Sequence, residues 1–321
     1  MSKTSIKVLD IQRLSTEDGP GLRTTVFVKG CPLRCAWCHN PESIQPQEQM
    51  IWLENRCIGC RICEKICPQH AITLTEAGQT RDLSLCIGCQ SCADTCPTLS
   101  VEVKGHDWEV DALVRELLKD RAYFEKSGGG ITVSGGDPML QWETVAVLFR
   151  TLKEAGISTA LDSALLTTRN ALDTVLPYVD LILMDIKLIE EAEHKKWTGV
   201  SNEVILDNIR YIARRKREGK LATRIWIRTP IIPGATSTEE NIAGISRFID
   251  GNLRGLFERW EMCAFNNLCR DKYRRLGIDW QFAQTPLMTR AEMNAIHAVA
   301  RRNNSEPEKI FWTGSTAVES D

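Results

Sequence analysis

The chain has 321 residues, of which 43% are hydrophobic and 26% are charged, and its net charge is −2. This composition is typical of a folded protein and excludes extended disorder. The nearly neutral charge gives no reason to expect a nucleic-acid partner, so we interpret the basic run "RRKR" at 214–217 as a solvated helix face. The N-terminus lacks the apolar core of a signal peptide, and no run of about 18 apolar residues is present. We therefore expect a cytoplasmic protein with no membrane partner.

Two strands are predicted near the N-terminus, "IKVLDIQRL" at 6–14 and "RTTVFVKG" at 23–30. Cys31, Cys35 and Cys38 follow directly, so they lie in a loop at the carboxyl end of the second strand. Three thiolates on a cubane cluster leave one iron without a protein ligand, much as a catalytic zinc keeps one position open. We predict an open iron–sulfur cluster. The alternative is a zinc site completed by His39, but this side chain directly follows Cys38 and is poorly placed to complete a tetrahedron.

The next segment contains two runs with the spacing C-x2-C-x2-C-x3-C-P, which is the pattern of bacterial ferredoxins. In that pattern the fourth cysteine of each run binds the other cluster. The predicted ligand sets are Cys57, Cys60, Cys63 and Cys96 for one [4Fe-4S] cluster, and Cys86, Cys89, Cys92 and Cys67 for the other. Zinc ribbons also contain C-x2-C pairs, but two complete runs with matching prolines favour clusters. Disulfides are unexpected in a reducing compartment.

Beyond this block, apolar strands alternate with amphipathic helices, which predicts right-handed parallel βα units. The predicted strands are "GGGITVSGG" at 128–136, then 157–162, 180–186, 224–230 and 256–264; the predicted helices are 107–126, 140–155, 169–177, 202–218, 238–250 and 289–302. We expect an α/β fold, a partial barrel of the (βα)6 type with an inserted bacterial ferredoxin-like domain. The predicted parts are 1–51, 52–104 and 105–321. Chemistry in such barrels occurs at the carboxyl ends of the strands.

The cluster loop has the form C-x3-C-x-aromatic-C, with Trp37 as the aromatic residue, and resembles the radical S-adenosylmethionine (SAM) superfamily. The longer stretch "DGPGLRTTVFVKGCPLRCAWCHNPES" at 18–43 is similar to the activating enzymes of glycyl radical enzymes. The similarity continues in "SGGGITVSGGDP", "MDIK" and "RTPIIPG". This resemblance implies a radical SAM barrel, three [4Fe-4S] clusters and SAM as a cofactor, and many members of the family carry a two-cluster insertion at the same place.

The resemblance also implies which residues hold SAM. Gly135, Gly136 and Asp137 stand where the family has a Gly-Gly-Glu-Pro type motif, and Asp137 replaces its glutamate. Other implied SAM-site residues are Trp37, Asp162, Asp185 and Lys187, with Lys187 paired to the SAM carboxylate and a monovalent cation near Asp162. On its own, "MDIK" would be interpreted as a strand end with a solvated charge pair.

Asp18 and Arg228 resemble the residues that receive the glycine-bearing loop of the partner enzyme, although an arginine buried at a strand end is otherwise more often structural. One position departs from the family pattern, since Asn266 occupies the place of a histidine upstream of Lys272-Tyr273. Cys263 and Cys269 lie nearby, and we interpret them as small residues in a strand and a loop rather than as ligands.

The implied reaction is reductive cleavage of SAM to methionine and a 5′-deoxyadenosyl radical, which takes a hydrogen from a glycine Cα of a partner glycyl radical enzyme. Flavodoxin or ferredoxin is the implied electron donor. No side chain need act as an acid or base, because the protein contributes ligands and positioning. Two alternatives are a radical SAM enzyme acting on a small molecule or an unrelated peptide, and a pure electron carrier. The long βα region after the cysteine block argues against the carrier.

Overall fold

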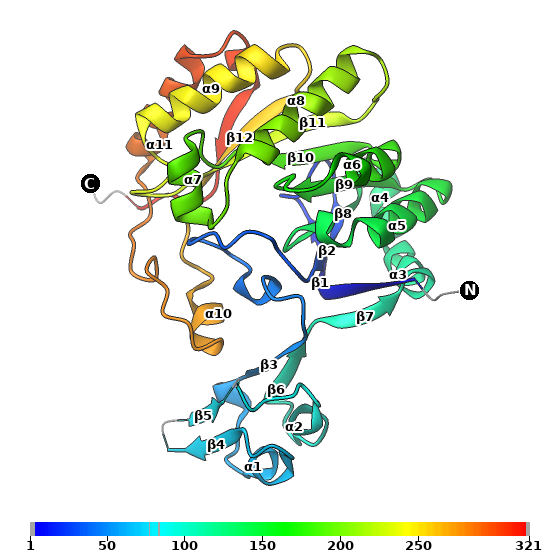
Figure 1. The fold of residues 1–321 in the computed structure, drawn as a ribbon, viewed down its shortest axis with the longest axis vertical. Helices are drawn as coiled ribbons and strands as arrows, with labels where there is room; N and C mark the ends of the chain where they lie inside the picture. Colours follow the sequence, from blue (N-terminus) through cyan, green and yellow to red (C-terminus); the bar gives the residue numbers. More distant parts are fainter. Residues whose placement is uncertain (1–3, 77, 83, 319–321) are drawn as a thin grey trace.

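The chain folds around a nine-stranded sheet in the order β13-β12-β11-β10-β9-β8-β2-β1-β7 (Figure 1). The computed structural model describes residues 4–76, 78–82 and 84–318. From β2 to β13 the neighbouring strands are parallel, whereas β1 is antiparallel to both β2 and β7. The strands are β1 Ser5–Ser15, β2 Arg23–Val28, β7 His106–Glu109, β8 Gly130–Gly135, β9 Ser158–Ser163, β10 Leu181–Asp185, β11 Arg224–Ile231, β12 Arg259–Ala264 and β13 Ile310–Thr313. The predicted α/β class with a mostly parallel sheet is confirmed.

Amphipathic helices cover one face of this sheet and form the main core with it. Val133 of β8, Leu148 of the following helix and Ile182 of β10 are fully buried in the same cluster. The helices of this core are α3 Val110–Leu117, α4 Arg121–Ser127, α5 Trp142–Glu154, α6 Arg169–Val175, α8 Glu203–Arg217, α9 Glu239–Leu253 and α11 Arg290–Arg302, whereas α7 Glu191–Thr198 and α10 Arg270–Arg275 contribute no residue to it. The basic run 214–217 forms the last turn of α8, where cations interact favourably with the helix dipole.

The opposite face of the sheet carries a much smaller apolar cluster of Ala160, Leu181 and Leu183, with Trp226 packed against it. Side chains alternate between the two faces along a strand. Asp162 and Asp185, two residues beyond Ala160 and Leu183, therefore continue this inner face toward the carboxyl ends of their strands. The inner face thus changes from apolar to charged at the end where a site is expected.

The helix predicted over 107–126 is wrong as a single element. Residues 106–109 form β7 against β1, and a 3-10 turn, Leu118–Asp120, separates α3 from α4. The buried carboxylate of Asp120 accepts a hydrogen bond from Thr24 Oγ1 at 2.7 Å and pairs with Arg13. These long-range partners fix the turn, and helical periodicity does not reveal them.

Residues 49–104 leave the main sheet and form a small unit with its own core, drawn at the bottom of Figure 1. Its elements are β3 Gln49–Trp52, α1 Ile62–Ile66, β4 Ile72–Thr75, β5 Gly78–Arg81, α2 Ser91–Asp94 and β6 Val101–Lys104. β3 pairs with β6 and β4 with β5. Ile72, Cys92, Ala93 and Val101 are buried together. Because β3 and β6 are adjacent antiparallel strands, the unit leaves and rejoins the rest of the chain at nearly one point.

Short 3-10 turns are the remaining elements, at Pro41–Ser43, Glu54–Arg56, Pro138–Gln141, Leu176–Tyr178 and Pro307–Lys309. Among the described residues, none of the helices has both the length and the apolar character needed to cross a membrane.

Candidate functional site

The loop after β2 contains Cys31, Cys35 and Cys38, all partly exposed. Burial of the sulfur atoms, with smaller contributions from neighbouring thiolates, raises the pKa of each thiol to about 12. The ammonium group of Lys187 opposes this rise in all three. These mutual effects indicate that the three sulfur atoms and Lys187 share one small region. Three soft donors beside a cation suit a cluster whose thiolate ligands carry negative charge.

Two segments fix the backbone of this cysteine loop from opposite sides. On one side, Tyr273 Oη donates to Cys38 O at 2.8 Å and Trp280 Nε1 donates to Ala36 O at 2.8 Å. On the other side, Ala36 N donates to Trp197 O at 2.9 Å. The rings of Tyr273 and Trp280 stack with their centroids 4.7 Å apart. Neither Trp197 nor Trp280 belongs to a sequence motif, so neither was predicted as part of the site.

Trp37 is only 5% exposed and packs against Trp197, with ring centroids 6.3 Å apart. Its side chain belongs to a buried aromatic cluster under the cysteine loop. Cys269 is also buried there and donates a weak hydrogen bond from Sγ to Cys38 O at 3.8 Å. Trp37 and Cys269 therefore stabilise the cysteine loop from its buried side.

The glycine pair at the end of β8 runs directly beside the cysteine loop. Gly136 N donates to Val28 O at 2.9 Å, and Asp137 N donates to Gly30 O at 2.8 Å. A Cβ atom at Gly136 would lie 2.1 Å from Gly30 O, and Gly135 has a φ of +113° that disfavours other residues. The two glycines are thus required for β8 to approach the loop this closely.

The carboxylate of Asp137 is buried and fully occupied within the protein. It accepts hydrogen bonds from Met139 N at 2.9 Å, Ser163 Oγ at 2.8 Å and Ala164 N at 3.0 Å. Burial raises its pKa to about 6, and these three donors oppose the rise. The side chain that departs from the family motif therefore ties the end of β8 to the end of β9.

Charged side chains line the ends of the next strands on the inner face. Asp185 of β10, Arg228 of β11 and Glu261 of β12 are register partners across adjacent strands. Lys187 Nζ pairs with Asp185 Oδ2 at 2.6 Å. Burial alone would lower the pKa of Lys187, but Asp185 and the neighbouring thiolates and carboxylates raise it above its ordinary value. Lys187 is thus a fully charged ammonium group beside the cysteine loop.

Arg228 is the centre of a second charged group, and its side chain is 14% exposed. Its guanidinium lies 3.6 Å from Asp162, 3.9 Å from Asp18 and 3.3 Å from Glu261, and it donates to Glu17 O. Burial raises the pKa of Asp162 to about 6, although Arg228 opposes this rise. The structure therefore brings Asp18 and Arg228 together and joins them to the Asp162–Asp185 side of the site.

Cys263 and Asn266 occupy the end of β12 and the turn after it. Burial raises the pKa of Cys263 to about 12, while the charge of Arg228 lowers it. The side chain of Asn266 accepts a hydrogen bond from Leu268 N at 3.2 Å, which stabilises the local turn. Nearby, Lys272 Nζ donates to Asn40 Oδ1 at 2.8 Å and pairs with Glu42 at 2.7 Å.

The eight cysteines of the 49–104 unit lie on a structural repeat. Gly59 and Gly88 have φ values of +70° and +71°, and Arg61 and Gln90 have φ values of +57° and +63°. Each run then continues into a short helix, α1 or α2. The two halves therefore share the same backbone conformation at equivalent positions.

One cavity in this unit is lined by four cysteines that come from both runs, Cys67, Cys86, Cys89 and Cys92. These are the four residues that the crossed ferredoxin pattern groups together. Backbone N–H groups also donate to the fourth cysteine of each run, from Ala71 to Cys67 Sγ at 3.3 Å and from Ser100 to Cys96 Sγ at 3.2 Å. In the part of the chain that the structure describes, no group of three or more His, Cys, Asp or Glu side chains has the arrangement of a single metal-ion site.

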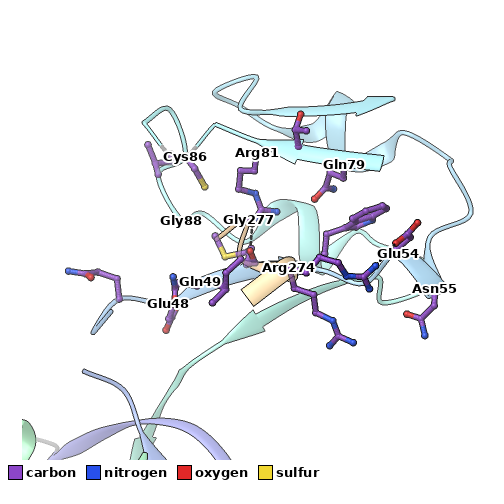
Figure 2. A pocket seen from close by; sticks show the side chains of 17 residues that line it. Glu48, Gln49, Glu54, Asn55, Gln79, Arg81, Cys86, Gly88, Arg274 and Gly277 are labelled. Atoms are coloured by element: carbon purple, nitrogen blue, oxygen red, sulfur yellow. Dashed lines mark hydrogen bonds and ion pairs between the residues drawn. The ribbon is translucent and has the colours of Figure 1, made fainter. Parts of the chain in front are cut away.

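A cleft separates this unit from α10, and Figure 2 shows the side chains that line it. Cys86 and Gly88 line it from the unit, and Gly277 lines it from the segment after α10. Arg274 of α10 pairs with Glu54 across the cleft at 3.6 Å. Helix α10 thus contacts the cysteine-rich unit through Arg274 and the loop of Cys38 through Tyr273.

Comparison with known proteins identifies the family. Residues 17–206 match the family model described as a 4Fe-4S single cluster domain. The chain is 38% identical over 302 residues to the (2S)-3-sulfopropanediol dehydratase activating enzyme of Klebsiella oxytoca, covering 92% of this chain and 93% of that protein. It is 36% identical to the indoleacetate decarboxylase activating enzyme of Tractidigestivibacter scatoligenes, covering 91% and 93%.

The chain belongs to the activating enzymes of glycyl radical enzymes. These activating enzymes are radical SAM enzymes that generate a radical on a glycine of a partner protein. The fold is also similar to that of SuiB from Streptococcus suis bound to its precursor peptide SuiA, with a TM-score of 0.50 at 10% identity over 88% of this chain and 46% of that chain. The predicted enzyme class is confirmed, and an iron–sulfur cluster and SAM as cofactors are supported.

Proposed function

We propose that this activating enzyme holds three [4Fe-4S] clusters, and that Cys31, Cys35 and Cys38 bind the one at which SAM reacts. The observation that carries the proposal is the meeting of the cysteine loop, the glycine pair and Lys187 at the carboxyl ends of β2, β8 and β10. When bound, the cluster and SAM supply one-electron cleavage to methionine and a 5′-deoxyadenosyl radical. The protein itself contributes ligands, orientation and exclusion of water.

The SAM-holding residues in this proposal are Lys187, Asp185, Asp162 and the backbone of Gly135 and Gly136. The charged Lys187 ammonium pairs with the SAM carboxylate, and the glycine pair leaves room for the SAM amino group beside the cysteine loop. Asp162 lies among several carboxylates of the site, which supports a monovalent cation nearby. Trp37 and the side chain of Asp137 hold the surrounding loops in place.

Arg228 and Asp18 receive the glycine-bearing loop of the partner in this proposal. They lie on the same charged face as Asp162, so a glycine held there is next to the SAM residues. Relatives that serve a dehydratase and a decarboxylase are almost equally similar to this chain. We therefore assign the choice of partner to surface residues outside this shared site.

We further propose that residues 52–104 are a ferredoxin-like domain inserted between residues 1–51 and 105–321. Cys57, Cys60, Cys63 and Cys96 would bind one of its clusters, and Cys86, Cys89, Cys92 and Cys67 the other. The shared backbone repeat and the cavity lined by one complete ligand set support this arrangement. Flavodoxin or ferredoxin is the proposed electron donor, and the many free thiols favour the reducing cytoplasm.

The test is SAM cleavage by the anaerobically reconstituted protein reduced with dithionite. We expect methionine and 5′-deoxyadenosine in equal amounts, and no 5′-deoxyadenosine from a variant with alanine at Cys31, Cys35 and Cys38. Product formation by that variant would contradict the assignment of the SAM cluster. A wild-type protein that is reduced but releases no 5′-deoxyadenosine would support the electron-carrier alternative.

A further inference from the structure

Strand β5 directs two different hydrogen-bond donors at two cysteines of the inserted unit. Gln79 Nε2 donates to Cys63 Sγ at 3.3 Å, and Arg81 Nη2 donates to Cys92 Sγ at 3.6 Å. The two donors are two residues apart, so they leave the strand on the same side, as Figure 2 shows. One donor is a neutral amide and the other is a permanently charged guanidinium.

Cys63 and Cys92 are equivalent residues of the repeat, each the third cysteine of its run. Each follows a left-handed residue, Arg61 or Gln90, and lies in the short helix that begins there. Because the backbone is equivalent at the two cysteines, their environments differ in the side-chain donors that β5 provides.

Arg81 is held firmly in its place. Its Nη1 donates to Met50 O at 2.7 Å, which ties β5 to β3. Its Nε is buried and has no hydrogen-bond partner among the described residues. Arg81 also lines the cavity formed by Cys67, Cys86, Cys89 and Cys92. A rigid cation thus lies at the wall of one proposed cluster site and has donor capacity left over.

The environments of the two thiols differ in burial as well. Cys92 is 7% exposed and is the most buried of the eight cysteines in the two runs, whereas Cys63 is partly exposed. Reduction adds one negative charge to a cluster, and burial away from water disfavours that charge. A cation or a hydrogen bond at a ligand sulfur has the opposite effect and favours the reduced cluster.

We propose that Arg81 raises the reduction potential of the cluster ligated by Cys67, Cys86, Cys89 and Cys92, and makes it the more easily reduced of the two inserted clusters. The inference rests on the proposed clusters of the inserted unit. Arg81 acts through Cys92 and the local field, so it is a positioning residue. Reduction transfers one electron from the reductant to the cluster, and no bond forms or breaks.

The test is a redox titration of the reconstituted full-length protein with dithionite, monitored by electron paramagnetic resonance, with SAM added to set apart the signal of the SAM cluster. Arg81→Gln replaces the charged donor to Cys92 by a neutral amide, the kind of donor that Gln79 already directs at Cys63. We expect the higher of the two reduction potentials of the inserted clusters to fall by about 59 mV or more, which is at least a tenfold change in the one-electron equilibrium constant. The potential of the other cluster should not change. Gln79→Arg should raise the lower potential.

Two controls separate charge from position. Arg81→Lys keeps the charge, so its higher reduction potential should stay close to that of the wild type. Lys65→Gln removes an exposed charge from α1, and neither potential should shift by more than roughly a threefold change in the one-electron equilibrium constant. Equal shifts of both clusters in Arg81→Gln, or no shift, would overturn the proposal. Loss of iron from Arg81→Gln would also overturn it, because Arg81 would then act by holding the cluster loop.

The iron content of the wild-type protein tests the foundation separately. About twelve irons per chain support the two inserted clusters, and about four would overturn those clusters without reference to Arg81. With about twelve irons bound, only the titration decides the role of Arg81.

Discussion

Replacing Lys187 by alanine removes the ammonium group that pairs with Asp185 at 2.6 Å. The two side chains are 13% and 22% exposed, so water screens their charges less than those of a surface pair. In the proposed site this ammonium group also pairs with the SAM carboxylate, and a charge-assisted hydrogen bond in such a place contributes about 1 to 3 kcal/mol to binding. We therefore expect Lys187→Ala to weaken SAM binding by about 5-fold to 150-fold in Kd.

The assay is equilibrium binding of SAM to the anaerobically reconstituted protein, measured by calorimetry, with iron content determined on the same samples. The matched control is Lys220→Ala. It removes a lysine that pairs with Glu218 at 2.9 Å, and the side chains of Lys220 and Glu218 are 63% and 40% exposed. Exposed pairs contribute little, so this control should bind SAM like the wild type. An unchanged Kd for Lys187→Ala at full iron content would refute the SAM-binding role and leave Lys187 as a structural partner of Asp185.

Three further predictions concern the clusters and the loop that holds one of them. Alanine at Cys31, Cys35 and Cys38 together should remove about four of about twelve irons, measured by iron analysis, and loss of all twelve would contradict independent sites. Alanine at Cys57, Cys60 and Cys63 should leave the SAM-induced change of the paramagnetic signal intact. That variant should slow glycyl radical formation more with flavodoxin than with a small chemical reductant, and equal rates with both would contradict a relay. Tyr273→Phe should lower the free energy of unfolding by about 0.5 to 1.5 kcal/mol, because the hydrogen bond to Cys38 O is lost. The same change at the exposed Tyr123 should leave the free energy of unfolding unchanged.

The features predicted best from the sequence are those with a fixed spacing. Cys31, Cys35 and Cys38 follow β2, and Asp162, Asp185 and Arg228 lie at or near the ends of their strands. Alternation of apolar strands and amphipathic helices is enough to place such residues, because parallel strands bring their carboxyl ends to one edge.

Elements of low amphipathic contrast were not predicted. The short helices α7 and α10 have few apolar residues in a regular pattern, and the edge strand β13 is only four residues long. The helix α7 is positioned by contacts such as His194 Nδ1 with Val200 O at 2.7 Å, and α10 by Tyr273. Their places depend on partners far away in the sequence or on local polar contacts, which periodicity does not encode.

Supporting side chains were also beyond the sequence. The motif position of Asp137 suggested the SAM site, but only the structure shows that its carboxylate joins Ser163 and Ala164 to the glycine turn. Arg81 and Gln79 lie outside every motif and gain meaning from their distances to Cys92 and Cys63. Such roles depend on three-dimensional contacts and leave no spacing pattern.

The most direct test of the account uses a partner glycyl radical enzyme whose glycine residues carry deuterium at Cα. The partner is the one encoded nearest to this chain's gene, and the reaction contains SAM and dithionite under anaerobic conditions. The account predicts a glycyl radical signal in the partner and one deuterium in the 5′-deoxyadenosine that is formed. Formation of 5′-deoxyadenosine without deuterium and without a glycyl radical would contradict activation of that partner by this chain.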